Sequence, residues 1–276
     1  MKNSRLFQVL AGLSPTQHNA FQRFLHSPYF NTREDLIELY TYIAQHLGEQ
    51  DTEFEKEKVF IAIYPGEVFD DTKLRLTMSY LNKLLEKFLI TENVLQDKTE
   101  SSWRLQNAFW NLELNPLAEK SLEKSLADLE KEPIRNADFW DWQYQMQFEK
   151  LYRINTQAEI SDLPLQSIVD TLDIGFASKK LRQICLLLNR KAVYQTDFEP
   201  GLMDGIIQLI HQKNWLQYPA ISVYFYAFLS LSERTDESHF HHFKAELFKN
   251  GEKFPSGELH QLHLLAINYC VQKINQ

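Results

Sequence analysis

Glycine is scarce in this sequence, with 8 glycines among 276 residues, about 3% against roughly 7% in average proteins. Tight turns between β-strands depend on residues that adopt positive φ, and glycine is their usual supplier. No segment shows the alternation of apolar and polar residues that a half-buried strand needs. These two absences argue against a β-rich fold and leave an all-α protein as the expected class.

Cysteine and long hydrophobic runs are also rare. The two cysteines, Cys185 and Cys270, are too few for a disulfide framework, and each lies in an apolar run where we expect a buried thiol. The longest apolar run, residues 221–231, falls short of the roughly 18 to 20 residues of a membrane helix. The first residues carry no recognisable signal peptide. We therefore expect a cytoplasmic protein with no membrane association.

Cations are outnumbered, since 29 Lys and Arg residues stand against 37 Asp and Glu residues, for a net charge of -8. A negative chain repels nucleic acid at long range, so nucleic-acid binding is not expected. The sequence also lacks a GxSxG elbow, a glycine-rich phosphate loop, an HExxH helix, paired CxxC motifs and a dinucleotide fingerprint. We assign no catalytic, cofactor-binding or metal-binding residue, and we expect a protein that is not an enzyme and needs no cofactor.

Helix start signals are frequent, and apolar residues follow them at helical spacing. Residues 14–17 have the pattern of a capping box with proline in the first turn, which predicts a helix to about His26. Residues 31–34 repeat this pattern before a helix that Gly48 ends. Further helices are predicted over residues 54–64, 71–89, 115–133 and 136–154, with later starts at Pro164, Pro200, Pro219 and Ser256.

The expected architecture has two regions, an N-terminal helical bundle over residues 1–97 and a helical-repeat region over residues 98–276. Prolines 164 and 200 are 36 residues apart, and so are prolines 219 and 255, which is close to the length of a tetratricopeptide (TPR) helix pair. No consensus sequence repeats between these prolines, so an irregular helical bundle is the alternative.

The last predicted helix, residues 256–276, is apolar and ends without a glycine stop or a polar tail. A repeat region normally closes with a capping unit that has a polar outer face. We therefore expect the chain to be truncated within its repeat region, the last helix to expose an apolar stripe, and the chain to self-associate through it.

Three segments carry a resemblance to a known family: AFQRFLHSPYFN at residues 20–31, LRLTMSYLNKLLEKFL at residues 74–89 and INYCVQKIN at residues 267–275. Together they resemble a bacterial family of uncharacterised all-helical proteins. The resemblance covers roughly the whole chain and implies TPR-like repeats that continue beyond the position of Gln276. It implies no activity and assigns no site residue.

Histidines gather on the last two predicted helices. Two pairs have the i, i+3 spacing that places side chains on one helix face, and an antiparallel hairpin could join both pairs into a metal site. We prefer the interpretation that they flank a core stripe of Phe240, Phe243 and Leu247, because no carboxylate or cysteine lies in ligand spacing beside them. The pairs are His239 with His242 and His260 with His263, and the fifth histidine is His241.

Aromatic side chains are concentrated in the helix predicted over residues 136–154. We expect the i, i+4 series that starts at Trp140 to be a buried stripe, with Trp142 outside it. A contact surface for a partner and a stacking platform for a small molecule are the alternatives. The aromatic residues are Phe139, Trp140, Trp142, Tyr144, Phe148 and Tyr152, and the core interpretation extends to Trp103, Phe109 and Trp110.

Residues 54–89 resemble a helix-turn-helix arrangement in which the long second helix would contact DNA. That helix carries four cations, but acidic residues crowd just before it, where phosphates would need positive charge. The cations are Lys73, Arg75, Lys83 and Lys87, and the acidic residues include Glu67, Asp70 and Asp71.

Helical repeats form extended, often concave surfaces that hold peptides or partner proteins. The expected function is therefore a non-enzymatic, cytoplasmic protein-interaction scaffold that binds a peptide or partner protein on helical-repeat surfaces. The alternatives are a DNA-binding regulator that uses the N-terminal helices and a metal-dependent enzyme at the His-rich helical hairpin.

Overall fold

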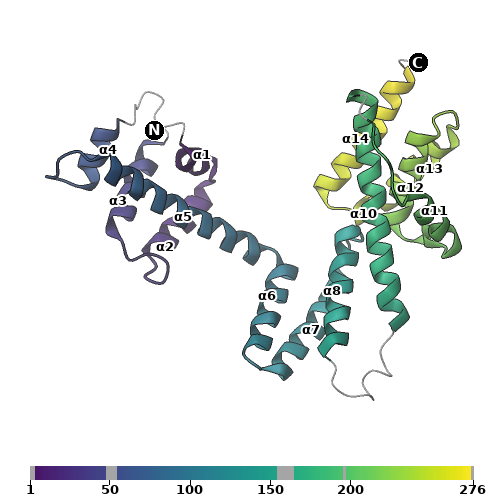
Figure 1. Cartoon of the computed structure of the whole chain (residues 1–276), viewed down its shortest axis with the longest axis horizontal. Coiled ribbons are helices and arrows are strands. Elements are labelled where there is room, and N and C mark those ends of the chain that lie inside the picture. The colour runs from purple at the N-terminus through teal and green to yellow at the C-terminus, as the bar shows by residue number, and fades with distance from the viewer. Residues whose placement is uncertain (1–3, 48–54, 154–164, 195–196, 275–276) are drawn as a thin grey trace. The chain divides into compact units, whose positions relative to one another are not determined.

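The computed structural model describes residues 4–47, 55–153, 165–194 and 197–274. Over these residues the chain forms thirteen α-helices, two 3-10 helices and no β-strand, which confirms the all-α class (Figure 1). None of the described helices is both long and apolar enough to cross a lipid bilayer. In chain order the helices are α1 (Arg5–Gly12), α2 (Pro15–His26), α3 (Glu34–His46), α4 (Lys56–Ile63), α5 (Asp71–Gln96), α6 (Lys98–Asn111), α7 (Asn115–Lys131), α8 (Ala137–Arg153), α10 (Leu165–Tyr194), α11 (Met203–Gln212), η1 (Trp215–Gln217), α12 (Pro219–Ser232), α13 (Ser238–Asn250), η2 (Gly251–Lys253) and α14 (Ser256–Ile274).

The helices divide into two compact units, unit 1 with residues 1–101 and unit 2 with residues 102–276. Unit 1 packs α1 to α5 around one apolar core. Aromatic rings form its centre, since Phe21 meets the ring of Tyr40 edge-on at 5.1 Å and the ring of Phe88 at 5.2 Å. Leu10 brings α1 into the same core. Neither α1 nor α6 is predicted from the sequence, and α1 begins without a side-chain cap.

Local capping chemistry decides where α2 and α5 begin. The Ser14 hydroxyl accepts a hydrogen bond from the Gln17 backbone N–H at 3.3 Å, and the Gln17 side chain accepts one from the Ser14 N–H at 2.9 Å. This capping box confirms the predicted start of α2. The Asp70 carboxylate accepts hydrogen bonds from the N–H groups of Thr72 and Lys73, and it thereby caps α5.

The predicted cap at Asn31 is wrong. The N-cap of α3 is Arg33, and no side chain caps this helix. The Asn31 amide instead folds the preceding loop, because it donates hydrogen bonds to the carbonyl oxygens of Leu25 and Arg33 and accepts one from the Arg33 N–H. Asparagine side chains that bond to nearby backbone groups favour such turns over helix starts.

One further boundary needs correction, and four lie outside the described residues. The helix expected to start at Pro200 starts at Met203, because Gly201 has a φ of +67°, a left-handed conformation that interrupts a helix. The predicted boundary residues Gly48, Phe54, Ile154 and Pro164 lie outside the described residues.

Unit 2 is a series of neighbouring helices: α7 packs on α8, α8 on α10, α10 on α12, and α12 on α13. Gly175 allows α8 and α10 to approach closely, since a Cβ atom there would lie 3.4 Å from the Trp140 Cβ and from a carboxylate oxygen of Asp141. Lys179 forms an ion pair with Asp141 across the same contact. The larger core of the unit surrounds α12, and a smaller one joins α6, α7 and α8.

The aromatic series of α8 is not the buried stripe that we expected. Phe148 is 45% exposed and Tyr152 is 72% exposed, whereas Phe139 and Met146 are buried. The buried pair belongs to the core that α8 shares with α7, and this contact selects a different face of the helix. The core interpretation holds for Trp110, which is buried in the same cluster.

The two cysteines differ, so the expectation of two buried thiols is wrong for Cys270. Cys185 is buried, its thiol donates a hydrogen bond to the Tyr224 carbonyl at 3.3 Å, and burial raises its pKa. Cys270 is exposed on the outer face of α14. That face also carries the apolar stripe expected on this helix, made of Leu264, Ile267, Val271 and Ile274.

A buried carboxylate joins distant parts of unit 2. Glu258, in the first turn of α14, is 5% exposed. Its two oxygens accept hydrogen bonds from the Tyr224 hydroxyl and the Asn136 amide, each at 2.8 Å. Arg182 lies 3.7 Å away. Burial and the neighbouring carboxylate raise the pKa of Tyr224 far above its ordinary value, so the hydroxyl keeps the proton that it donates.

Candidate functional site

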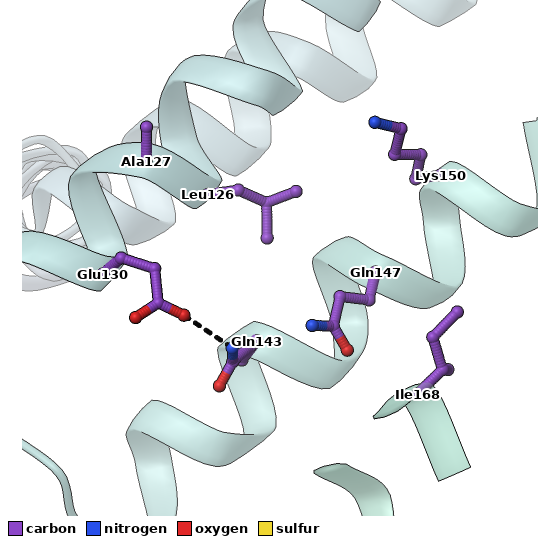
Figure 2. A pocket seen from close by; sticks show the side chains of 7 residues that line it. All are labelled: Leu126, Ala127, Glu130, Gln143, Gln147, Lys150 and Ile168. Atoms are coloured by element: carbon purple, nitrogen blue, oxygen red, sulfur yellow. Dashed lines mark hydrogen bonds between the residues drawn. The ribbon is translucent and has the colours of Figure 1, made fainter. Parts of the chain in front are cut away.

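A groove of about 320 Å³ lies between α7 and α8 in unit 2, with α10 at one side (Figure 2). The two helices run antiparallel, because Glu130 of α7 pairs with Gln143 of α8 while Glu123 pairs with Lys150. We call this surface the α7–α8 groove. Its lining residues are Leu126, Ala127, Glu130, Gln143, Gln147, Lys150 and Ile168.

One part of the α7–α8 groove is apolar and is formed by Leu126 and Ile168. Leu126 projects from α7 into the space between the helices, toward Gln147 (Figure 2). Ile168 of α10 is 5% exposed and contributes a further aliphatic surface. Such a surface favours an apolar side chain over water.

Two glutamine amides form the polar wall on α8. The Gln143 amide donates a hydrogen bond to a Glu130 oxygen at 2.7 Å. The side-chain oxygens of Gln143 and Gln147 are buried, and neither has a hydrogen-bond partner among the described residues. A buried polar atom without a partner costs roughly 1–3 kcal/mol, so these amides are prepared to bond with an added donor.

The spacing of these two glutamines matches an extended peptide. Gln143 and Gln147 are four residues apart on α8, which corresponds to about 6 Å along the helix axis. Alternate residues of an extended chain repeat every 6.6 Å or so. A peptide that lies along α8 would therefore present one backbone amide group to each glutamine. The terminal amide torsion of glutamine is soft, so either its oxygen or its nitrogen can turn toward the peptide.

The two ends of the α7–α8 groove differ in charge. Glu130 is at one end, with a side chain 57% exposed and the Arg135 guanidinium 3.9 Å away. Lys150 is near the other end, with a side chain 43% exposed and the Glu123 carboxylate 3.9 Å away. Neither separation is a close ion pair, so the Lys150 ammonium and the Glu130 oxygen that does not bond to Gln143 can meet a ligand. The groove thus combines an apolar floor, two amides and charges of opposite sign.

The histidines do not converge as a metal site. His239 contacts the Glu233 carboxylate at 3.0 Å, and His242 bonds to the Ser238 carbonyl and stacks on Tyr226. Within the part of the chain that the structure describes, no three His, Cys, Asp or Glu side chains form a group that could hold a metal ion. Of the expected core stripe, Phe243 and Leu247 are buried in the larger core of unit 2, and Phe240 is partly buried against it.

The cations at the start of α5 are neutralised by carboxylates. Lys73 pairs with Glu67 at 2.6 Å, and Arg75 pairs with Asp71 at 2.7 Å. Their positive charge is therefore not free to contact phosphates along the first turns of this helix. Lys83 lies further along α5 and carries no such pair among the described residues.

Sequence reasoning did not find the α7–α8 groove. Its polar residues belong to no motif, and the aromatic residues of α8 drew attention to other faces of the same helix. The available signal was the glutamine pair at i, i+4 spacing, which places both side chains on one face of α8. The site needs the antiparallel contact between α7 and α8, which no local pattern specifies.

Comparison with protein-family models, with curated proteins and with solved structures gives no match for this chain.

Proposed function

We propose that the chain is a non-enzymatic, cytoplasmic protein-interaction scaffold, and that unit 2 binds an extended peptide in the α7–α8 groove. One observation carries the proposal: the buried amide oxygens of Gln143 and Gln147 have no hydrogen-bond partner among the described residues, and they lie beside apolar side chains. A peptide backbone supplies hydrogen-bond donors and acceptors at the spacing of these two amides.

The arrangement of unit 2 supports a TPR-like helical-repeat region of the proposed kind. The helices α7, α8, α10, α12 and α13 pack on one another in this order, and such a series presents continuous surfaces between neighbouring helices. Unit 1, with its single core, supports the proposal of a separate N-terminal helical bundle. A scaffold of this design recognises partners by shape and hydrogen bonding, without covalent chemistry.

The groove also suggests which side chains such a peptide carries along its length. A basic side chain would meet Glu130, an apolar one would pack on Leu126 and Ile168, and an acidic one would meet Lys150. Residues 143 and 150 of α8 are about 10 Å apart along the axis, which an extended peptide spans in three or four residues.

The test begins with random 12-residue peptides displayed on phage and selected against the immobilised full chain. Selected peptides are synthesised with a fluorophore and titrated by fluorescence anisotropy. We expect Gln143→Leu and Gln147→Leu each to weaken binding by about tenfold, the effect of losing one hydrogen bond of roughly 1.4 kcal/mol.

Gln145→Leu is the matched control, because Gln145 lies on the same helix but is exposed. It should leave the affinity unchanged. If no peptide is enriched, or if Gln145→Leu weakens binding as much as Gln147→Leu, the proposal is wrong.

A further inference from the structure

Unit 1 has an exposed aromatic and cationic surface that is independent of the α7–α8 groove. It combines the loop between α2 and α3 with the middle of α5. Tyr29 is 88% exposed, Leu76 54% and Tyr80 45%. Exposed aromatic and arginine side chains are typical of the residues that dominate binding at protein interfaces. We call it the Tyr80 surface, and define it as Tyr29, Phe30, Arg33, Leu76, Tyr80, Lys83 and Lys87.

The loop that presents Tyr29 is held by several interactions. The N–H groups of Phe30 and Asn31 both donate to the Ser27 carbonyl at 3.0 Å. The Asn31 side chain is 9% exposed and bonds to backbone on both sides of the turn. The Phe30 ring stacks on Phe24 at 4.0 Å. Tyr29 is therefore presented by an ordered turn, so a partner loses little conformational entropy when it binds there.

Two cations lie against the ring of Tyr80. The Arg33 guanidinium is 4.5 Å from the ring centre, and the Lys83 ammonium is 5.7 Å from it. Asp35 fixes Arg33 through two hydrogen bonds, of 3.0 and 2.6 Å, made by Nε and one terminal nitrogen. The other terminal nitrogen of Arg33 makes no hydrogen bond within the described residues and keeps its donors for a ligand.

The positive charge of this surface is not balanced. Lys83 and Lys87, one turn apart on α5, form no ion pair within the described ranges, in contrast to Lys73 and Arg75. The Arg33 charge is offset by Asp35, so the two lysines supply the excess. A partner that matches this surface carries carboxylates beside an apolar or aromatic side chain.

We propose that the Tyr80 surface docks an acidic segment of a partner protein, with carboxylates on Lys83, Lys87 and the free Arg33 donors and an apolar side chain on Tyr80 and Leu76. The exposed apolar area favours a protein over nucleic acid. Duplex DNA would also meet Glu67, Asp70 and Asp71 near the start of α5, and two unpaired lysines are few for a phosphate backbone.

The test uses the full chain and three fluorescein-labelled probes. The first is a 12-residue peptide that repeats Asp-Glu-Leu-Tyr, the second repeats Lys-Arg-Leu-Tyr, and the third is a 12-base-pair DNA duplex. Fluorescence anisotropy at 50 and 150 mM NaCl should show the acidic peptide binding at least about tenfold tighter than either other probe, with weaker binding at the higher salt.

Variants locate the binding. Tyr80→Ala and Lys83→Glu should each weaken binding of the acidic peptide by about tenfold, the size of a moderate interface residue. Lys98→Glu makes the same charge change at an exposed position of unit 1 outside the surface and should have little effect. Far-UV circular dichroism of each variant shows that its fold is retained, and Tyr29→Ala gives a second test at a position with no core contact to lose.

Three outcomes overturn the proposal. The acidic peptide binds no tighter than the basic one; or Lys98→Glu weakens binding as much as Lys83→Glu, which means that only net charge matters; or the duplex binds best and loses affinity in Lys83→Glu, which makes the surface a nucleic-acid site. Because the Gln143 and Gln147 variants leave this surface unchanged, a failure here is separate from a failure of the peptide groove.

Discussion

Each unit has a carboxylate that several hydrogen bonds hold in place, Asp35 in unit 1 and Glu258 in unit 2, and the two differ in burial and in their partners. In unit 1, Asp35 lies near the surface with its side chain 20% exposed, and it is paired with the Arg33 guanidinium and the Tyr64 hydroxyl. In unit 2, Glu258 is 5% exposed, and its close partners are the neutral Tyr224 and Asn136.

This difference shows what each carboxylate does for its unit. Asp35 bonds to Arg33, two residues away, and so organises one edge of a small domain. Glu258 bonds to Asn136, which is 122 residues earlier in the chain, so it ties the start of α8 to the start of α14. A buried charge is tolerated only if its hydrogen bonds are satisfied, and here donors from separate helices satisfy them.

Removal of the buried carboxylate should have the largest effect on stability. Glu258→Ala leaves the buried Tyr224 hydroxyl without its acceptor, removes one of the two acceptors of the Asn136 amide, and takes away the carboxylate 3.7 Å from Arg182. We expect a loss of about 3–5 kcal/mol in the free energy of unfolding of unit 2. All five tryptophans lie between residues 103 and 215, within unit 2, so tryptophan fluorescence in urea reports on this unit.

Glu252→Ala is the control for that measurement, because the Glu252 side chain is 79% exposed. It should shift the urea midpoint little. An equal, small shift in both variants would show that Glu258 does not hold the helices together, and the contrast between the units would disappear.

Replacement of Asp35 should lower the free energy of unfolding by less than replacement of Glu258, and it should leave the stability of unit 2 unchanged. Asp35→Asn weakens the bonds to Arg33 and Tyr64, and we expect a loss of about 1–2 kcal/mol. The transition followed by far-UV circular dichroism should shift, while the tryptophan transition should stay in place. A shift of the tryptophan transition would contradict the assignment of this cluster to unit 1 alone.

The ion pair of Arg33 and Asp35 also predicts that the stability of unit 1 depends on pH. The Arg33 hydrogen bond, aided by the Tyr64 hydroxyl, lowers the pKa of Asp35 below its ordinary value, despite the opposing effect of burial. A lowered pKa stabilises the folded state above the unfolded pKa of about 3.9, and this contribution is lost as the pH falls through the folded pKa. The difference in free energy of unfolding between the wild type and Asp35→Asn should therefore be largest at pH 7 and should shrink toward pH 2.5. A constant difference would contradict this account.

Several helix starts could be predicted from the sequence, but the buried face of α8 could not. The starts of α2, α5, α7 and α12 depend on residues within one turn, such as Ser14 and Pro219, so local chemistry specifies them. Which side of α8 is buried depends on α7 and α10, which contact it from different directions. Both Phe139 and Phe148 fit a helical stripe, yet only Phe139 is buried.

The candidate site shows the same limit. By sequence, its glutamines are ordinary surface residues. Their significance comes from side-chain oxygens that are buried with no partner in the part of the chain that the structure describes. Composition excluded whole classes of fold, whereas the groove became visible only when antiparallel helices brought Glu130 opposite Gln143.

Gln106 gives the smallest expected effect. Like Glu258 it is a buried polar residue of unit 2, but unlike Glu258 its side chain has no hydrogen-bond partner among the described residues. Its side chain is fully buried, and neither its amide nitrogen nor its amide oxygen has a partner among the described residues. A leucine of similar volume would remove two unsatisfied groups and keep the packing, so Gln106→Leu should stabilise unit 2 by about 1 kcal/mol. The urea midpoint of tryptophan fluorescence measures this change, with the exposed Gln145→Leu as control. If Gln106→Leu destabilises unit 2 instead, the Gln106 amide has a hydrogen-bond partner in solution. Gln106 would then resemble Glu258, as a buried polar side chain whose hydrogen bonds are satisfied.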